Sequence, residues 1–143
     1  MKSLRQRVQQ GAALLGCFLN LGSSLTAEII DMAGFDWVLI DVEHGAGSER
    51  DVLPQLQALE HTCGAGVVRV ESTARQRAHR VLDLGAHGIM FPRVNTAEEA
   101  RSAVAARTAN PHIRAAKPLL VRAMLVRVHV AAATSSVVNF PGA

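Results

Sequence analysis

Two carboxylates and a histidine follow one another at the end of a short apolar run. Asp41, Glu43 and His44 lie in the segment D-W-V-L-I-D-V-E-H-G-A-G, residues 36–47, between a strand-like stretch and a glycine-rich turn. In α/β proteins, catalytic residues concentrate where a buried strand ends and its loop begins. A histidine near carboxylates can be held in one tautomer and act as a general base near neutral pH. The segment therefore indicates a candidate acid–base site.

A cation lies inside the next apolar run. Arg69 belongs to V-V-R-V, residues 67–70, where a guanidinium without an anionic partner would be costly. Its planar fork suits a carboxylate or an enolate oxygen. Glu71 follows the same run, and Pro92 and Arg93 follow the run after it. If the runs are parallel strands, all of these residues reach one edge of a sheet.

The spacing leaves alternatives open for each candidate. His44 is as consistent with a solvated loop residue as with a base. Arg69 is as consistent with a structural pair to Asp41 or Glu43 as with a substrate-binding group. Asp83, just before Gly85, is better explained as a residue that caps or pairs within its own helix.

The elements that must position these residues alternate between strand and helix. Strands are predicted over 13–19, 36–40, 66–70 and 88–91, and helices over 24–33, from 48 onward, over 73–84 and from 96 onward. Such alternation implies parallel pairing with right-handed crossovers. About four such units would make half of a (β/α)₈ barrel, whereas a whole one needs roughly 200–250 residues. The pattern alone fits either a small open α/β sheet or part of a barrel.

Cap signals mark the helix boundaries. Ser23 or Ser24 can cap the first of these helices, and Gly34 stands where a left-handed residue ends it. Ser48 can cap the second, and T-A-E-E at 96–99 is a capping box.

Composition fits one globular domain. The chain has 143 residues, of which 49% are hydrophobic and 19% charged. The two cysteines, Cys17 and Cys63, match no disulfide framework or zinc pattern, so we expect reduced thiols and a cytoplasmic protein. We expect no signal peptide and no membrane span, since no uncharged apolar run approaches the ~20 residues that a bilayer requires.

Charge divides the chain in two. All twelve acidic residues lie at or before Glu99, with nine Lys or Arg, whereas residues 100–143 hold six Lys or Arg and no acid. Glycine is also nearly absent there. We therefore expect one domain over 1–106 and an atypical basic, acid-free tail over 107–143. A less favoured alternative is that the tail is a basic amphipathic helix that packs on a partner or a membrane surface.

Four segments together resemble the HpcH/HpaI aldolases, the class II enzymes of the 4-hydroxy-2-oxoheptanedioate aldolase family. They read G-C-F-L-N-L-G-S-S (16–24), A-E-I-I-D-M-A-G-F-D-W-V-L-I-D-V-E-H-G (27–45), V-V-R-V (67–70) and L-D-L-G-A-H-G-I-M-F-P-R-V-N-T-A-E-E-A (82–100). The resemblance covers residues 11–106 in register. It implies the N-terminal half of a (β/α)₈ TIM-type barrel, with an atypical C-terminal tail.

The resemblance also implies a reaction. The family cleaves 4-hydroxy-2-oxo acids to pyruvate and an aldehyde with a divalent metal, Mg, Mn or Co. By the match of motifs, His44 is the acid/base and acts through water on the aldol hydroxyl, while Arg69 holds the pyruvyl oxygen as enolate charge develops. Asp41 and Asp83 would support the histidine. An enolate needs such preorganised positive charge in a site poor in water.

The same resemblance places Glu43 in the outer shell of the metal, with Phe18 and Pro92 as further substrate or outer-shell residues. The family's metal ligands are a glutamate and an aspartate beyond the matching region, and this chain has no acid after Glu99. We therefore expect no metal ligand in this chain, weak metal binding and little turnover. We interpret the tail as a frameshifted or otherwise aberrant extension of a truncated aldolase.

The resemblance implies a small-molecule 2-oxo acid substrate and a homo-oligomer for the full-length family. A non-catalytic alternative is a half-barrel that acts as an interaction or assembly module. Nucleic-acid binding is disfavoured because the basic tail has no aromatic residue for base stacking except Phe140.

Overall fold

Strands and helices alternate along the chain, as the sequence predicts. The computed structural model describes residues 4–60, 65–108 and 137–138. The elements are α1 (Leu4–Gln9), β1 (Leu14–Leu19), α2 (Ser24–Met32), β2 (Trp37–Asp41), the 3-10 turn η1 (Glu49–Asp51), α3 (Val52–Ala58), β3 (Ala65–Arg69), α4 (Arg75–Asp83), β4 (Gly88–Met90), α5 (Ala97–Thr108) and β5 (Val137–Val138).

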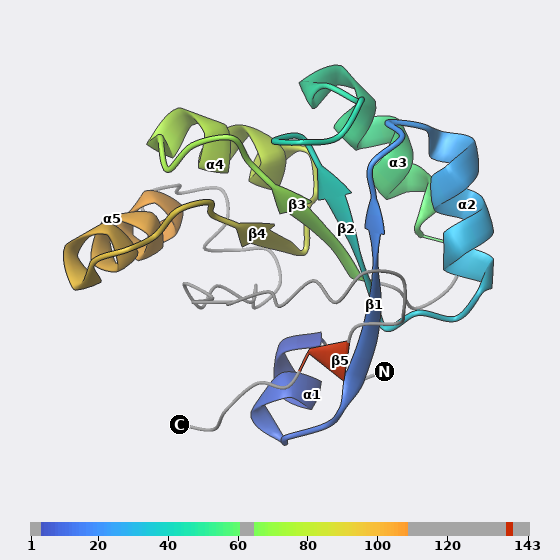
Figure 1. The fold of residues 1–143 in the computed structure, drawn as a ribbon, viewed down its shortest axis with the longest axis horizontal. Coiled ribbons are helices and arrows are strands. Elements are labelled where there is room, and N and C mark those ends of the chain that lie inside the picture. Colours follow the sequence, from blue (N-terminus) through green and yellow to red (C-terminus); the bar gives the residue numbers. More distant parts are fainter. Residues whose placement is uncertain (1–3, 61–64, 109–136, 139–143) are drawn as a thin grey trace.

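The strands form one sheet in the order β4-β3-β2-β1-β5. Strands β1 to β4 pair in parallel, and the two-residue β5 pairs antiparallel with β1. Helices α2 to α5 cover one face of this sheet, and α1 lies apart from them (Figure 1). A sequential parallel order with every crossover helix on one face is the arrangement of a (β/α) barrel, whereas a doubly wound sheet carries helices on both faces.

The central strand β2 is buried on both sides. Its Val38 and Ile40 belong to the core shared with the helices, while Trp37 and Leu39 belong to a second cluster. Because side chains alternate along a strand, Asp41 lies on the same side as Trp37 and Leu39. The apolar residues of β2 thus anchor the strand in both clusters, and the buried carboxylate of Asp41 lies at the carboxyl end of β2.

The face opposite the helices is packed tightly at the amino ends of the strands. Leu4 and Val8 of α1 pack there against Leu14 and Trp37. A Cβ added at Gly16 would lie 2.0 Å from the Trp37 ring. Glycine is required at this position because the indole lies directly against the backbone of β1.

The predicted caps of α2 and α5 are confirmed. The Ser23 hydroxyl accepts from the backbone N–H of Thr26, and Gly34 follows α2 with φ +82°. The Glu99 carboxylate accepts from the Thr96 N–H at 3.0 Å, and the Thr96 hydroxyl accepts from the Glu99 N–H at 3.1 Å. These bonds satisfy donors that the first turn of α5 leaves unpaired.

Several elements differ from the prediction. Ser48 and Asp51 form a capping box, but it opens η1 rather than α3. Helix α4 begins at Arg75 instead of residue 73. Helix α1 and strand β5 were not predicted. Most of the predicted tail, residues 109–136 and 139–143, lies outside the described residues, and none of the described helices is long and apolar enough to cross a membrane.

Candidate functional site

A buried ion pair joins the carboxyl ends of the two central strands. Asp41 of β2 and Arg69 of β3 are register partners, so their side chains leave the same face side by side. Arg69 Nε donates to Asp41 Oδ1 at 2.8 Å, and the terminal NH₂ group of Arg69 donates to Oδ2. The Asp41 side chain is 1% exposed and that of Arg69 21%. The structure therefore contains the Asp41–Arg69 pair that the sequence left open as a structural alternative.

Electrostatics keeps both groups of this pair charged. Burial on its own would raise the pKa of Asp41, but hydrogen bonds from Arg69 and from the backbone of His44 and Glu43 outweigh it and hold that pKa below its ordinary value. The hydrogen bond to Asp41 raises the pKa of Arg69. The guanidinium is consequently a permanent cation at the strand edge.

Asp41 also organises the turn that follows β2. Its Oδ1 accepts from the backbone N–H of Glu43 at 3.0 Å and of His44 at 3.1 Å. A Cβ at Gly45 would lie 2.2 Å from the Asp41 carbonyl oxygen, so only glycine lets the chain pass so close. These contacts explain why an aspartate and a glycine flank the Glu-His pair.

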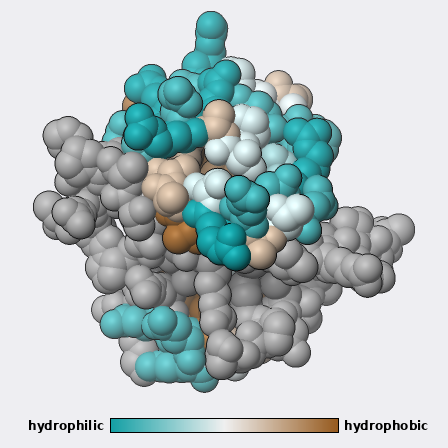
Figure 2. All heavy atoms as spheres, turned by 90° about the vertical axis from the view of Figure 1, so that its left-hand side faces the viewer, coloured by the Kyte–Doolittle hydropathy of each residue, from teal (hydrophilic) through white to brown (hydrophobic). Residues whose placement is uncertain are grey.

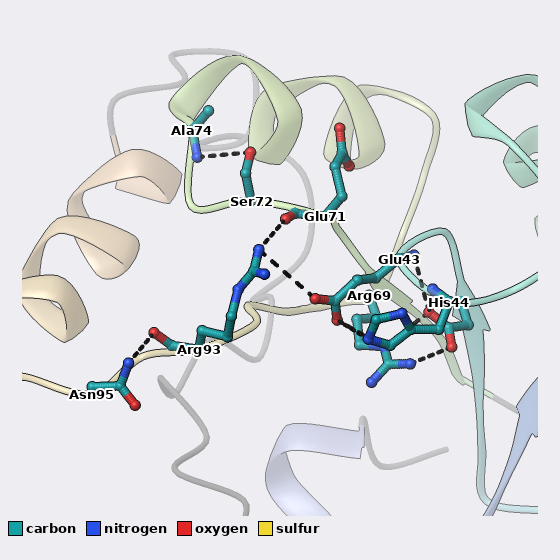
Figure 3. A network of polar contacts seen from close by, with 9 residues as sticks. Glu43, His44, Arg69, Glu71, Ser72, Ala74, Arg93 and Asn95 are labelled. Carbon is teal, nitrogen blue, oxygen red and sulfur yellow. Dashed lines mark hydrogen bonds and ion pairs between the residues drawn. The ribbon is translucent and has the colours of Figure 1, made fainter.

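Glu43 is the residue on which the polar contacts converge. Its side chain is 10% exposed, and its Oε2 lies 3.5 Å from Arg69 Nε and 3.7 Å from His44 Nε2. Its Oε1 lies 4.0 Å from a terminal nitrogen of Arg93. Figure 3 shows these side chains converging from the ends of β2, β3 and β4. The resemblance implies an outer-shell position for Glu43, and its pairing with Arg69 was one of the alternatives left open. Its contacts with His44 and Arg93 were not predicted.

His44 points away from the protein interior. Its side chain is 71% exposed, and its ring contacts the Glu43 carboxylate. Asp41 accepts from the His44 backbone N–H, while the imidazole faces Glu43, and the role of Asp41 in supporting the histidine stays a prediction. The ring is open to solvent at the strand edge, where a water-relayed proton transfer has room.

Phe18 brings the first strand into the site. It lies on the same face as Asp41, with the Arg69 guanidinium carbon 5.9 Å from its ring centroid. Its ring meets Trp37 edge-on, with centroids 6.3 Å apart and an interplanar angle of 68°. This contact couples the cation to the packed aromatic core beneath it.

Two predicted site residues stand apart from this cluster. Pro92 is buried two residues after the end of β4, and its ring brings no polar group to the edge. Asp83 is the last residue of α4, which starts after the carboxyl end of β3 and returns to the amino end of β4. Within this chain the direction of α4 places Asp83 toward the opposite edge of the sheet from His44, and its support of the histidine stays a prediction. A helix after a parallel strand must run back across the sheet, so its last turn cannot share the strand's carboxyl edge.

Two exposed arginines of α4 bind carboxylates of the neighbouring loops. Arg77 and Arg80 hold Glu49 at 2.7 and 2.9 Å, and Arg77 also binds Glu71 at 2.6 Å. The hydrogen bond from Arg80, joined by that from Arg77, lowers the pKa of Glu49. These exposed pairs tie the loop after β2 to the loop after β3. The described residues on the α4 and α5 side form a largely hydrophilic surface (Figure 2).

The residues of this edge do not form a metal site. In the described part of the chain, no three His, Cys, Asp or Glu side chains are placed to share a metal ion. Asp41 is occupied by Arg69, and Glu43 contacts Arg69 and Arg93. Further carboxylates are absent from the sequence after Glu99. The donor set therefore does not fit the divalent metal that the resemblance implies.

Comparison with known proteins identifies relatives of this arrangement. The family model described as HpcH/HpaI aldolase/citrate lyase matches residues 14–138. A hydroxypyruvate/pyruvate aldolase of Paraburkholderia phytofirmans is 43% identical over 103 residues, covering 71% of this chain and 40% of the relative. A 5-keto-4-deoxy-D-glucarate aldolase of Salmonella arizonae is 41% identical over 91 residues, covering 64% and 36% respectively.

A solved structure agrees with this relationship. An HpcH/HpaI aldolase/citrate lyase family protein from Burkholderia cenocepacia superposes with a TM-score of 0.68 at 40% identity, covering 72% of this chain and 41% of that one. The predicted family and the predicted (β/α)-barrel fold are confirmed. The chain spans about two fifths of the length of these relatives.

Proposed function

Because the chain belongs to the HpcH/HpaI aldolase/citrate lyase family, we propose that its strand edge is the 2-oxo-acid-binding part of an aldolase site. The reaction is the cleavage of a 4-hydroxy-2-oxo acid to pyruvate and an aldehyde. The observation that carries this proposal is the permanent cation Arg69, held by Asp41 beside Glu43 and the exposed ring of His44.

The proposed chemistry follows from the charge that develops. A base takes the proton of the C4 hydroxyl, the C3–C4 bond breaks, and its electron pair passes to C3 and the 2-oxo oxygen as an enolate. Protonation at C3 then gives pyruvate. Arg69 stabilises the enolate oxygen, and His44 moves the hydroxyl proton through a water molecule. Phe18 covers one side of the guanidinium and limits the water around it.

The described residues supply only part of such a site. A divalent metal would stabilise the same enolate, but Asp41 and Glu43 already contact cations, and among the described residues no third His, Cys, Asp or Glu is placed to share a metal ion with them. We therefore propose that residues 1–106 are the functional domain and that this chain alone has little aldolase activity. The metal ligands would have to come from another polypeptide segment. Two relatives are a hydroxypyruvate/pyruvate aldolase and a 5-keto-4-deoxy-D-glucarate aldolase, which supports small 2-oxo acids as substrates.

A chimera tests this function. Residues 14–106 of this chain would replace the matching segment of the Paraburkholderia phytofirmans relative, and pyruvate release would be measured with Mg²⁺, Mn²⁺ or Co²⁺. We expect an active chimera that loses at least about a hundredfold in kcat/KM on Arg69→Gln or His44→Ala. A folded chimera whose activity is indifferent to both substitutions would reject the assignment. Arg101→Gln, on the exposed side of α5, is the matched charge control.

A second candidate function is assembly, and an exposed apolar stripe favours it. Leu25, Ile29 and Met32 share one face of α2 by their spacing and are 65%, 60% and 76% exposed. Stripes of this kind mark interaction sites. In this reading the half-barrel pairs with a second copy of itself, as the homo-oligomer inferred for the family would suggest. Light scattering after size exclusion distinguishes the cases, since a wild-type monomer, or a dimer that persists in Ile29→Asp, would reject the assembly role.

A further inference from the structure

Arg93 is held in a conformation that is unfavourable for its residue type. Its φ is +50°, and it is the only residue other than glycine with a positive φ in the part of the chain that the structure describes. A Cβ makes this left-handed region costly, and such strain concentrates at functional sites. The Asn95 side chain donates to the Arg93 carbonyl oxygen at 3.0 Å and fixes the turn. Neither the enolate chemistry nor the packing proposed above makes use of the Arg93 side chain.

The turn directs the guanidinium of Arg93 to the strand edge. One terminal nitrogen donates to the Glu71 carbonyl oxygen at 3.2 Å and lies 4.0 Å from Glu43 Oε1 (Figure 3). The side chain is nevertheless 75% exposed, so most of its donor groups face solvent. A planar guanidinium with outward-facing donors is suited to binding a carboxylate in a bidentate manner.

Glu43 does not saturate Arg93. Arginines that serve structural pairs in this chain approach their carboxylates closely, as Arg77 and Arg80 do with Glu49 at 2.7 and 2.9 Å. Arg93 stays 4.0 Å from Glu43. At this distance, and with high exposure, the pair contributes little to stability. The arrangement is therefore poorly explained as a stabilising salt bridge.

The charge at the strand edge also requires Arg93. Asp41 and Arg69 neutralise each other, and Glu43 then adds one negative charge. Without a second cation, that charge would repel an anionic substrate. Because Arg69 and Arg93 approach the two different oxygens of the Glu43 carboxylate, they lie close enough for the two ends of one extended dicarboxylate to reach both.

We propose that Arg93 is a specificity-determining residue that binds a second carboxylate of the substrate. On this assignment, Arg69 holds the 2-oxo acid end and Arg93 holds an anionic group at the far end. The site then prefers dicarboxylic 2-oxo acids to monocarboxylic ones of the same length. This inference rests on the proposed function, since it assumes that a 2-oxo acid binds at Arg69.

A matched pair of probes tests the inference on the whole chain. Calorimetric titrations would compare 2-oxoadipate with 2-oxohexanoate, which has the same carbon chain without the distal carboxylate, and would use pyruvate as the common reference. We expect wild type to bind 2-oxoadipate roughly tenfold more tightly than 2-oxohexanoate. Arg93→Gln should abolish this preference and leave pyruvate binding within about twofold, whereas Arg93→Lys should retain part of the preference. Far-UV circular dichroism would confirm that each variant is folded.

The possible results distinguish a failure of the role of Arg93 from a failure of the proposed function. The role of Arg93 would be overturned if wild type bound 2-oxoadipate and 2-oxohexanoate with equal affinity. It would also be overturned if Arg93→Gln kept the preference for 2-oxoadipate, or if the surface control Arg101→Gln lost it as well. The proposed function would stand in each case, provided that pyruvate binds. Failure of a folded wild-type chain to bind pyruvate and both longer acids would reject the proposed function, and the inference with it.

Discussion

Replacing Asp41 by asparagine should destabilise the protein, because it removes the negative partner of the buried Asp41–Arg69 ion pair. Removing one partner of a buried ion pair costs about 3–5 kcal/mol, because a buried charge is left uncompensated. Asparagine keeps an oxygen for the backbone N–H groups of Glu43 and His44, which Asp41 Oδ1 accepts at 3.0 and 3.1 Å. Arg69 also retains Glu43, 3.5 Å from its Nε. We therefore expect a loss of about 2 kcal/mol in the free energy of unfolding.

The loss should depend on pH in a defined direction. The pKa of Asp41 is lowered in the folded state. Its charge therefore stabilises the fold fully above the unfolded pKa, about 4, and this contribution disappears as the pH falls through the folded pKa. The difference between wild type and Asp41→Asn should be constant near neutral pH and shrink in acid.

Urea titrations followed by fluorescence provide the assay, because Trp37 is the only tryptophan of the chain. Glu49→Gln is the matched control, since it removes a carboxylate from an exposed arginine cluster and should cost only about 0.5 kcal/mol. If Asp41→Asn cost no more than Glu49→Gln at neutral pH, the reasoning about the buried pair would be refuted.

Three other perturbations follow from the packing, the caps and the donor set. Gly16→Ala should lower the free energy of unfolding by about 3 kcal/mol in a urea titration, because its Cβ would lie 2.0 Å from the Trp37 ring. Gly34→Ala, with open space around the added Cβ, should lower it by only about 1 kcal/mol. Equal losses in the two variants would contradict the clash at Gly16. Thr96→Ala should cost about 1 kcal/mol, since the Glu99 N–H loses its acceptor, and an unchanged unfolding midpoint by circular dichroism would argue against the cap. Adding Mg²⁺ or Mn²⁺, or removing metal with EDTA, should leave the melting temperature unchanged, and a rise of several degrees on metal addition would reveal a site.

Local patterns in the sequence were enough to predict the strands and helices that position the site. The parallel strands and the helix that begins after Thr96 follow from apolar runs and cap residues, which act over a few neighbours. The convergence of Asp41 and Arg69 follows from strand parity and parallel pairing, which bring the ends of neighbouring strands together.

The contacts within the site were harder to predict, because side-chain conformation decides them. Nothing in the sequence assigns Glu43 its place between Arg69 and Arg93, or gives Arg93 a positive φ. Motif matching alone does not show the direction in which α4 returns across the sheet, which sets Asp83 apart from the strand edge within this chain. The short helix α1 was missed because its six residues, L-R-Q-R-V-Q, carry too few apolar positions to show a period.

The most direct measurement of the central claim is a calorimetric titration of pyruvate into the wild-type chain and into Arg69→Lys. Lysine keeps the positive charge but loses the fork that reaches both a carboxylate and an enolate oxygen. If Arg69 binds the 2-oxo acid through this fork, we expect measurable binding to wild type and an affinity at least about tenfold weaker in the folded variant. Equal affinity in the two proteins, or no binding to a folded wild-type chain, would contradict it.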